Sequence, residues 1–215
     1  MLAGGAADLE GPRETLRRII RDANRAADVI KRLRTLFGKG ASTSESVDLN
    51  AAAREVIALS STELQHARIT LRAELSEDPP TVLGDRVQLQ QVILNLLLNA
   101  CEAMGAVMDR PRRLMIRTAT GGEDVIVSVQ DTGVGIDREH MDKLFEAFYT
   151  TKKDGMGIGL SVSRSIVESH RGRLWARPND GPGATFSFSI PRKPDHVEPA
   201  MGPGGLRTPA APPRT

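Results

Sequence analysis

The pattern of apolar residues divides the 215-residue chain into a helical segment, a mixed unit and an aperiodic tail. Between Arg13 and Phe37 apolar residues recur at alternating spacings of three and four, the period of one helix face. Further along, helical periods alternate with segments in which every second residue is apolar, as in half-buried strands. We expect helices over 49–66, 85–107, 139–145 and 160–170, and strands over 69–75, 81–83, 114–118, 125–129, 173–176 and 185–190.

Residues 46–191 are predicted to form one α+β unit. Gly121 and Gly122 separate two alternating segments, which is typical of a hairpin turn. Hairpin-connected strands mixed with helices indicate a two-layer α/β sandwich, in which helices cover one face of a mixed, mainly antiparallel sheet. Asp48 and Asp85 are expected to cap the helices that follow them.

The flanking segments are predicted to be organised differently. Residues 1–12 form a flexible lead-in, and residues 13–45 a long coiled-coil-type helix with its linker. The apolar seam of that helix is narrow and needs a partner helix, which predicts dimerisation through residues 13–37. Residues 192–215 are rich in proline and lack periodicity, so we expect a disordered tail. The seam consists of Leu16, Ile19, Ala23, Ala26, Ile30, Leu33 and Phe37.

Composition excludes several classes of function. The chain has 29 basic and 27 acidic residues and only 3% aromatic residues, so neither a basic field nor base stacking favours nucleic acid. A single cysteine, Cys101, excludes an internal disulfide and a multi-cysteine zinc site. No apolar run approaches the roughly 20 residues of a membrane span, and the start lacks a secretion signal. We therefore expect a cytoplasmic location, with no membrane contact by this fragment.

The helix predicted over 85–107 has an unusual polar face. Gln91, Asn95, Asn99 and Glu102 follow one another at spacings of four, four and three, which places them on one side of the helix. A solvent-facing stripe is one interpretation, although such stripes more commonly hold lysine, glutamate and arginine. Aligned carboxamides instead offer fixed oxygens to a hard cation such as Mg²⁺, which is the interpretation we favour.

Two glycine-rich segments offer complementary chemistry. Asp131-Thr-Gly-Val-Gly-Ile136 ends a predicted strand; it is either a simple turn or a carboxylate placed to accept a hydrogen bond from an exocyclic amine such as that of adenine. Gly155-Met-Gly-Ile-Gly-Leu160 precedes a helix, where free backbone N–H groups can hold a phosphate. Lys152 and Lys153 can reach a γ-phosphate or merely face solvent.

Taken together, these segments resemble the ATP-binding domain of bacterial sensor histidine kinases, in the GHKL ATPase superfamily. The resemblance covers about residues 48–191, with five motifs in the expected order. They are Gln91–Ala103 (N box), Asp131–Ile136 (G1 box), Leu144–Tyr149 (F box), Asp154–Leu160 (G2 box) and Gly183–Pro191 (the closing glycine–threonine strand). The 13–37 helix resembles the second helix of the dimerisation hairpin.

The resemblance implies ATP and Mg²⁺ as ligands. Asn95 and Asn99 would hold Mg²⁺, Asp131 would read the adenine amine, and Thr185 would support the adenine pocket from the sheet. Many members carry Lys or Arg where this chain has Glu102. The full set implied for ATP binding is Asn95, Asn99, Glu102, Asp131, Gly133, Gly135, Ile136, Phe148, Thr151, Lys152, Lys153, Gly155, Gly157, Gly159, Leu160 and Thr185.

The resemblance also implies the reaction. The module would donate the γ-phosphoryl group of ATP to a histidine on a partner segment or chain, for onward transfer to a response regulator. Asn95 stands where hydrolysing relatives carry a water-activating glutamate, and an amide cannot act as that base. None of the four histidines, His66, His140, His170 and His196, has the setting of a phosphoacceptor. A longer parent protein could carry a membrane anchor.

Two alternatives stay open. The chain could be a nucleotide-gated interaction or dimerisation module without turnover, or a related kinase that phosphorylates serine or threonine on a regulator.

Overall fold

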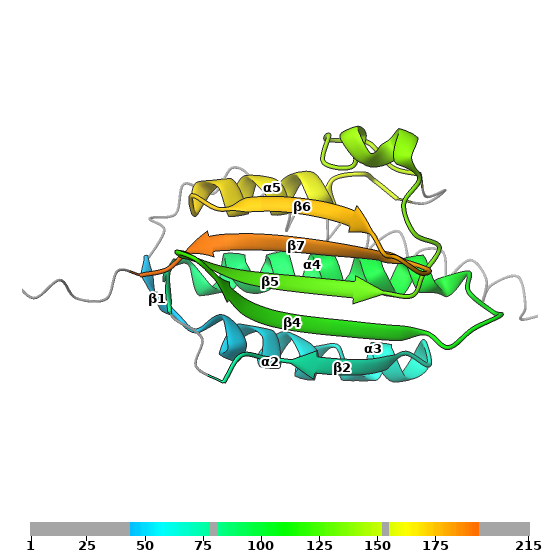
Figure 1. Ribbon diagram of the computed structural model, residues 1–215, viewed down its shortest axis with the longest axis horizontal. Helices are drawn as coiled ribbons and strands as arrows, with labels where there is room; N and C mark the ends of the chain where they lie inside the picture. The colour runs from blue at the N-terminus through cyan, green and yellow to red at the C-terminus, as the bar shows by residue number, and fades with distance from the viewer. Residues whose placement is uncertain (1–43, 78–80, 152–154, 194–215) are drawn as a thin grey trace, which may run out of the picture.

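The described residues form two layers. The computed structural model describes residues 44–77, 81–151 and 155–193. A five-stranded sheet forms one layer, and helices α2, α4 and α5 cover one of its faces (Figure 1). The predicted α+β sandwich is therefore confirmed. The elements are β1 (Glu45–Val47), α2 (Leu49–Leu59), α3 (Ser61–His66), β2 (Thr70–Glu74), β3 (Val82–Gly84), α4 (Arg86–Gly105), β4 (Arg113–Gly121), β5 (Asp124–Asp131), the 3-10 helix η1 (Arg138–Lys143), α5 (Gly159–Ser169), β6 (Arg173–Pro178) and β7 (Ala184–Pro191).

The sheet is mixed, as predicted. Its strand order is β2-β4-β5-β7-β6, with β2 parallel to β4 and every other neighbouring pair antiparallel. β4 and β5 form the predicted hairpin, and Leu114 pairs with Asp131 at its open end. β1 and β3 form a separate two-stranded antiparallel sheet. Because β5 and β7 are antiparallel, the end of β5, where the G1 segment begins, lies beside the start of β7.

Helix α4 occupies the centre of the molecule. It contacts α2, α5 and β5, and Leu89, Val92 and Ile93 are fully buried. Leu97 and Cys101 are also buried. A helix packed on three sides has little surface left for polar residues. Asn95, Asn99 and Glu102 therefore share one narrow stripe, whereas Arg86 and Gln90 contact Glu55 of α2.

The helix ends follow the predicted capping residues. The Asp48 carboxylate accepts a hydrogen bond from the Asn50 amide at 2.7 Å, and the Asp85 carboxylate accepts one from the Val87 amide at 2.9 Å. The prediction of a single helix over 49–66 was wrong, because α2 ends at Leu59 and α3 begins at Ser61. The Ser61 hydroxyl donates to the Ala58 carbonyl, a local bond that competes with helix continuation.

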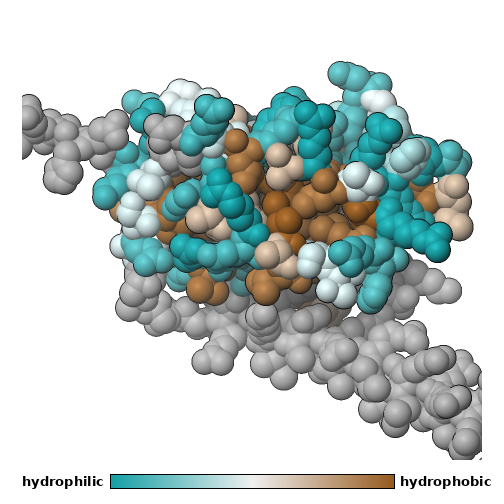
Figure 2. All heavy atoms as spheres, turned by 90° about the horizontal axis from the view of Figure 1, so that it is seen from below, coloured by the Kyte–Doolittle hydropathy of each residue, from teal (hydrophilic) through white to brown (hydrophobic). Residues whose placement is uncertain are grey.

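One side of the sandwich carries an apolar surface patch. Viewed from the side on which α2, α3 and β2 lie, apolar side chains gather in a central patch (Figure 2). Ile57 of α2 and Leu71 of β2 are partly buried and pack against the core. The predicted 13–37 helix and the tail beyond residue 193 lie outside the described residues. Within the described ranges, no helix combines the length and apolarity that a bilayer crossing requires.

Arg112 ties together the ends of two helices. Its guanidinium donates to the carbonyls of Gly105 at 3.2 Å and Val107 at 3.0 Å, where α4 ends, and to that of Ala67 at 2.9 Å, just after α3. Carbonyls in the last turn of a helix lack intrahelical partners, and a cation there also complements the helix dipole. No local feature of the sequence signals this role.

We expect Arg112→Ala to lower the free energy of unfolding by about 2 kcal/mol, because it removes charged donors from three carbonyls. Urea denaturation measures the loss. Arg113→Ala is the matched control: this exposed neighbour makes no side-chain hydrogen bond within the described part of the chain, so a change within about 0.5 kcal/mol is expected. Equal losses in the two variants would contradict the capping role.

Candidate functional site

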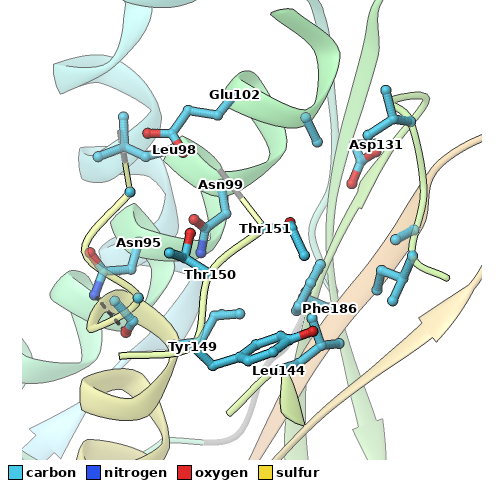
Figure 3. A pocket seen from close by; sticks show the side chains of 18 of the residues that line it. Asn95, Leu98, Asn99, Glu102, Asp131, Leu144, Tyr149, Thr150, Thr151 and Phe186 are labelled. Atoms are coloured by element: carbon cyan, nitrogen blue, oxygen red, sulfur yellow. Dashed lines mark hydrogen bonds between the residues drawn. The ribbon is translucent and has the colours of Figure 1, made fainter. Parts of the chain in front are cut away.

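A cavity of about 630 Å³ lies between α4, the sheet and the loops that precede α5 (Figure 3). Its two ends differ chemically. Asp131 and Phe186 lie at the sheet end, and Asn95, Asn99, Glu102 and Thr150 lie at the helix end (Figure 3). The lining also includes Val134, Gly135, Ile136, Thr151, Gly155, Gly157, Gly159 and Ala184.

The helix end is built on the polar stripe of α4. Asn95, Asn99 and Glu102 all line the cavity, whereas Gln91 does not. The Asn95 side chain is only 8% exposed. Its amide nitrogen donates to the Gly159 carbonyl at 3.5 Å and to the Ser163 hydroxyl at 3.3 Å, both in α5. These contacts fix the amide so that its oxygen is the atom left for another partner.

The sheet end is built around a buried carboxylate. Asp131 ends β5 and is 1% exposed. Burial raises the pKa of Asp131 above its ordinary value, while hydrogen bonds from the Gly133 and Ala184 amides oppose that shift. The Gly133 amide donates at 2.7 Å. A buried carboxylate of this kind is a strong acceptor for a donor brought in by a ligand.

Glycine is required in the turn after Asp131 by close packing. A Cβ atom on Gly133 would lie 2.8 Å from the Ala103 carbonyl of α4. The next residue, Val134, donates its amide to the same carbonyl at 3.2 Å. The turn is therefore held against the last part of α4, which sets the distance between the two ends of the cavity.

Two residues outside the predicted motifs hold the backbone of this turn. Arg110 donates to the carbonyls of Thr132 at 3.1 Å and Gly133 at 2.8 Å. Asn179, in the loop between β6 and β7, donates to the Asp131 carbonyl at 2.9 Å. Sequence reasoning missed both, because each contact joins residues far apart in the chain. The only available signal was Asn179 itself, an asparagine in a loop rich in proline and glycine.

Thr185 does not line the cavity. Successive side chains of a strand point to opposite faces, and its neighbours Ala184 and Phe186 face the cavity. Thr185 pairs with Gln130 on the other face, and its hydroxyl donates to the Asn179 side-chain oxygen at 2.7 Å. Thr185 therefore supports the Asp131 turn through Asn179 and is not itself a lining residue of the cavity.

Two backbone segments before α5, one at Phe148 and Tyr149 and the other at Gly157, cross in close contact. Gly157 has a φ of +66°, and a Cβ there would lie 2.5 Å from the Phe148 carbonyl carbon and the Tyr149 carbonyl oxygen. The Phe148 amide donates to the Gly157 carbonyl at 3.0 Å. Phe148 was expected to contact the nucleotide, but this residue is 77% exposed and does not line the cavity. Its left-handed backbone, with φ of +68°, serves the loop crossing instead.

The structure thus gathers most of the predicted residues around one cavity. Gly133 lies behind it, as part of the Asp131 turn, and Lys152 and Lys153 lie outside the described residues. Tyr149 lines the cavity without having been predicted, and its hydroxyl contacts Nδ1 of His140 at 2.7 Å. Predicted residues that line the cavity are Asn95, Asn99, Glu102, Asp131, Gly135, Ile136, Thr151, Gly155, Gly157, Gly159 and Leu160.

The donor set at the helix end fits a magnesium ion. Mg²⁺ binds oxygen ligands and commonly retains waters beside one or two protein side chains. Asn95 presents an amide oxygen whose orientation is fixed through α5, and Asn99 and Glu102 add further oxygens on the same side of α4 (Figure 3). The N-terminus of α5 begins at the same end of the cavity, where helix N–H groups attract anions.

Comparison with known proteins agrees with this arrangement. Residues 84–194 match the family of histidine kinase-, DNA gyrase B- and HSP90-like ATPases. The chain belongs to this family. Within it, the chain is a sensor-kinase type of ATPase domain, since a solved catalytic domain of histidine kinase ThkA matches with a TM-score of 0.63 and 34% identity. That match covers 69% of this chain and 95% of the ThkA domain.

Longer relatives match as well. The sensor protein FixL of Bradyrhizobium diazoefficiens is 40% identical over 193 residues, which cover 88% of this chain and 38% of FixL. The structure of ThkA in complex with the response regulator protein TrrA matches with a TM-score of 0.71 and 28% identity, over 88% of this chain and 53% of ThkA. The chain therefore spans well under half of FixL.

We expect Gly157→Ala to speed hydrogen exchange of the Phe148 amide by about tenfold, because a strained φ and a close contact cost about 1–2 kcal/mol. Exchange measured by NMR tests this. Gly159→Ala is the control, since a Cβ there meets no atom within 4 Å. Unchanged exchange in Gly157→Ala would show that the loops do not depend on this crossing.

Proposed function

We propose that this domain binds Mg²⁺–ATP in the cavity and donates the γ-phosphoryl group to a histidine on a partner segment or chain. A response regulator then receives the phosphoryl group. The observation that carries the proposal is the placement of buried Asp131 across one cavity from Asn95, Asn99 and Glu102, in the fold of a histidine kinase ATPase domain.

Adenine is assigned to the sheet end. There the Asp131 carboxylate accepts a hydrogen bond from the exocyclic amine, and Gly135 and Ile136 form part of the wall beside the base. Gly135 has a φ of +80°, which a residue with a side chain rarely adopts. Gly133 and Thr185 act from behind, by holding the Asp131 turn.

The triphosphate and its metal are assigned to the helix end. Asn95 and Asn99 hold Mg²⁺, which offsets the negative charge of the phosphates. Thr151, Gly155, Gly157, Gly159 and Leu160 line this end of the cavity beside the N-terminus of α5. We assign Lys152 and Lys153 to the phosphates as well. Phosphoryl transfer depends mainly on positioning and charge neutralisation, which this end supplies.

Transfer is favoured over hydrolysis by the chemistry of Asn95. A general base must accept a proton, and a carboxamide does not do so near neutral pH. The Asn95 amide is also engaged with Gly159 and Ser163 of α5. An attacking water therefore finds no base at this position of α4.

The wider organisation is proposed from the sequence. The predicted segment 13–45 provides a dimerisation-type helix over 13–37, through which two copies associate. Its last residue, Glu45, belongs to β1 of the ATP-binding domain. Arg192 and Lys193, which were predicted to begin the tail, donate their amides to the Glu123 and Thr81 carbonyls and also belong to the domain, so the proposed tail covers the residues after 193. A response regulator is the proposed downstream partner, in line with the ThkA–TrrA complex. We place this activity in the cytoplasm, where ATP is available.

We expect Asp131→Asn to weaken ATP binding by about tenfold to a hundredfold, because an amide nitrogen would then face the adenine amine. GTP and ITP carry an oxygen at that position and should lose less affinity. Calorimetric titration with the three nucleotides measures the difference. An equal loss for all three would remove Asp131 from base recognition.

Phosphoryl transfer itself can be tested in trans. ATP labelled at the γ-phosphate is incubated with this chain and a fragment carrying the phosphoacceptor helix of a histidine kinase. We expect acid-labile, base-stable label on the fragment, and none with Asn99→Ala, which removes the predicted metal ligand. ATP binding without transfer would instead favour a nucleotide-gated interaction module, and acid-stable label would favour a serine/threonine kinase.

A further inference from the structure

The charges that line the cavity are poorly matched to a triphosphate. Among the described lining residues the charged side chains are Glu102 and Asp131, both acidic, and none is a lysine, arginine or histidine. The phosphates add several negative charges to these two. Lys152 and Lys153 lie outside the described residues, and even two lysines would leave an excess of negative charge around a bound nucleotide. Favourable binding therefore depends strongly on the cation that accompanies the nucleotide.

Glu102 lies at the end of the cavity assigned to the phosphates. It is three residues after Asn99 on α4, so the two side chains project from the same side of the helix (Figure 3). Figure 3 shows both across the cavity from Asp131, beside the segment that carries Thr150 and Thr151. Within the described lining, Glu102 is the only carboxylate at the helix end.

The chemistry of Mg²⁺ assigns a role to this carboxylate. Mg²⁺ in nucleotide sites is usually held by one or two carboxylates together with phosphate oxygens. Asn95 and Asn99 are neutral, and Asp131 lies at the other end of the cavity. Glu102 is thus the residue that can provide the anionic ligand which the two carboxamides lack.

We propose that Glu102 is a third metal-holding residue, which makes this chain select the Mg²⁺ complex of ATP over free ATP. The proposal rests on the proposed function, because it assumes that ATP binds in this cavity. It opposes a simpler expectation, in which Glu102 only repels the phosphates. The two roles predict opposite effects of removing the Glu102 carboxylate. Loss of a metal ligand would lower the affinity for Mg²⁺–ATP, whereas loss of a repelling charge would raise it.

The test is the Mg²⁺ dependence of ATP binding, measured by calorimetry at a series of Mg²⁺ concentrations. In Glu102→Gln, which keeps the shape and removes the charge, we expect the Mg²⁺ midpoint to rise about tenfold or more. Binding of ATP without metal should stay equal or tighten. Glu102→Asp should recover part of the Mg²⁺ affinity. Electron paramagnetic resonance of Mn²⁺ provides a second readout, in which Glu102→Gln should bind less Mn²⁺ in the presence of ATP.

Glu63→Gln is the matched control, because Glu63 is an exposed glutamate of α3 that does not line the cavity. The Mg²⁺ midpoint of ATP binding in Glu63→Gln should match that of the unaltered chain. A Glu102→Gln midpoint within twofold of the unaltered chain, or tighter Mg²⁺–ATP binding, would overturn the role of Glu102 and leave the proposed function standing. Failure of the unaltered chain to bind ATP at any Mg²⁺ concentration would overturn the proposed function itself.

Discussion

Packing of α4 on three sides is the constraint on which the rest of the structure depends. The sheet, α2 and α5 bury this helix so completely that Leu89, Leu96 and Leu97 have no exposed surface. Three of its polar residues, Asn95, Asn99 and Glu102, lie on the side where the cavity opens. The same packing brings Asn95 against the first turn of α5, so the helix that supplies the core also orients the site.

The opposite wall of the cavity is positioned by backbone contacts. Arg110 and Asn179 hold three successive carbonyls, those of Asp131, Thr132 and Gly133, from two different parts of the chain. The Ala103 carbonyl of α4 accepts a hydrogen bond from the amide of the next residue, Val134. Two walls that are both anchored to α4 keep a fixed separation, which suits recognition of a ligand with a flat base at one end and charged groups at the other.

The sequence predicted what is encoded locally. Alternating apolar residues located the strands, and the spacing of Asn95 and Asn99 placed both on one helix face. Asp131 was identified as a candidate because it precedes two glycines at the end of a predicted strand. The contacts of Arg110 and Asn179 could not be predicted, since they join positions that only the fold brings together. The break at Ser60 was missed because helical periodicity continues across it. Strand alternation could have excluded Thr185 from the cavity, since Phe186 is the residue that belongs to the core face.

The most direct measurement is a crystal structure of this chain with Mg²⁺ and a non-hydrolysable ATP analogue. We expect the adenine amine within hydrogen-bonding distance of the Asp131 carboxylate, and the metal on the side of α4 that carries Asn95 and Asn99. An analogue bound elsewhere, or bound with its phosphates at the Asp131 end, would contradict the account.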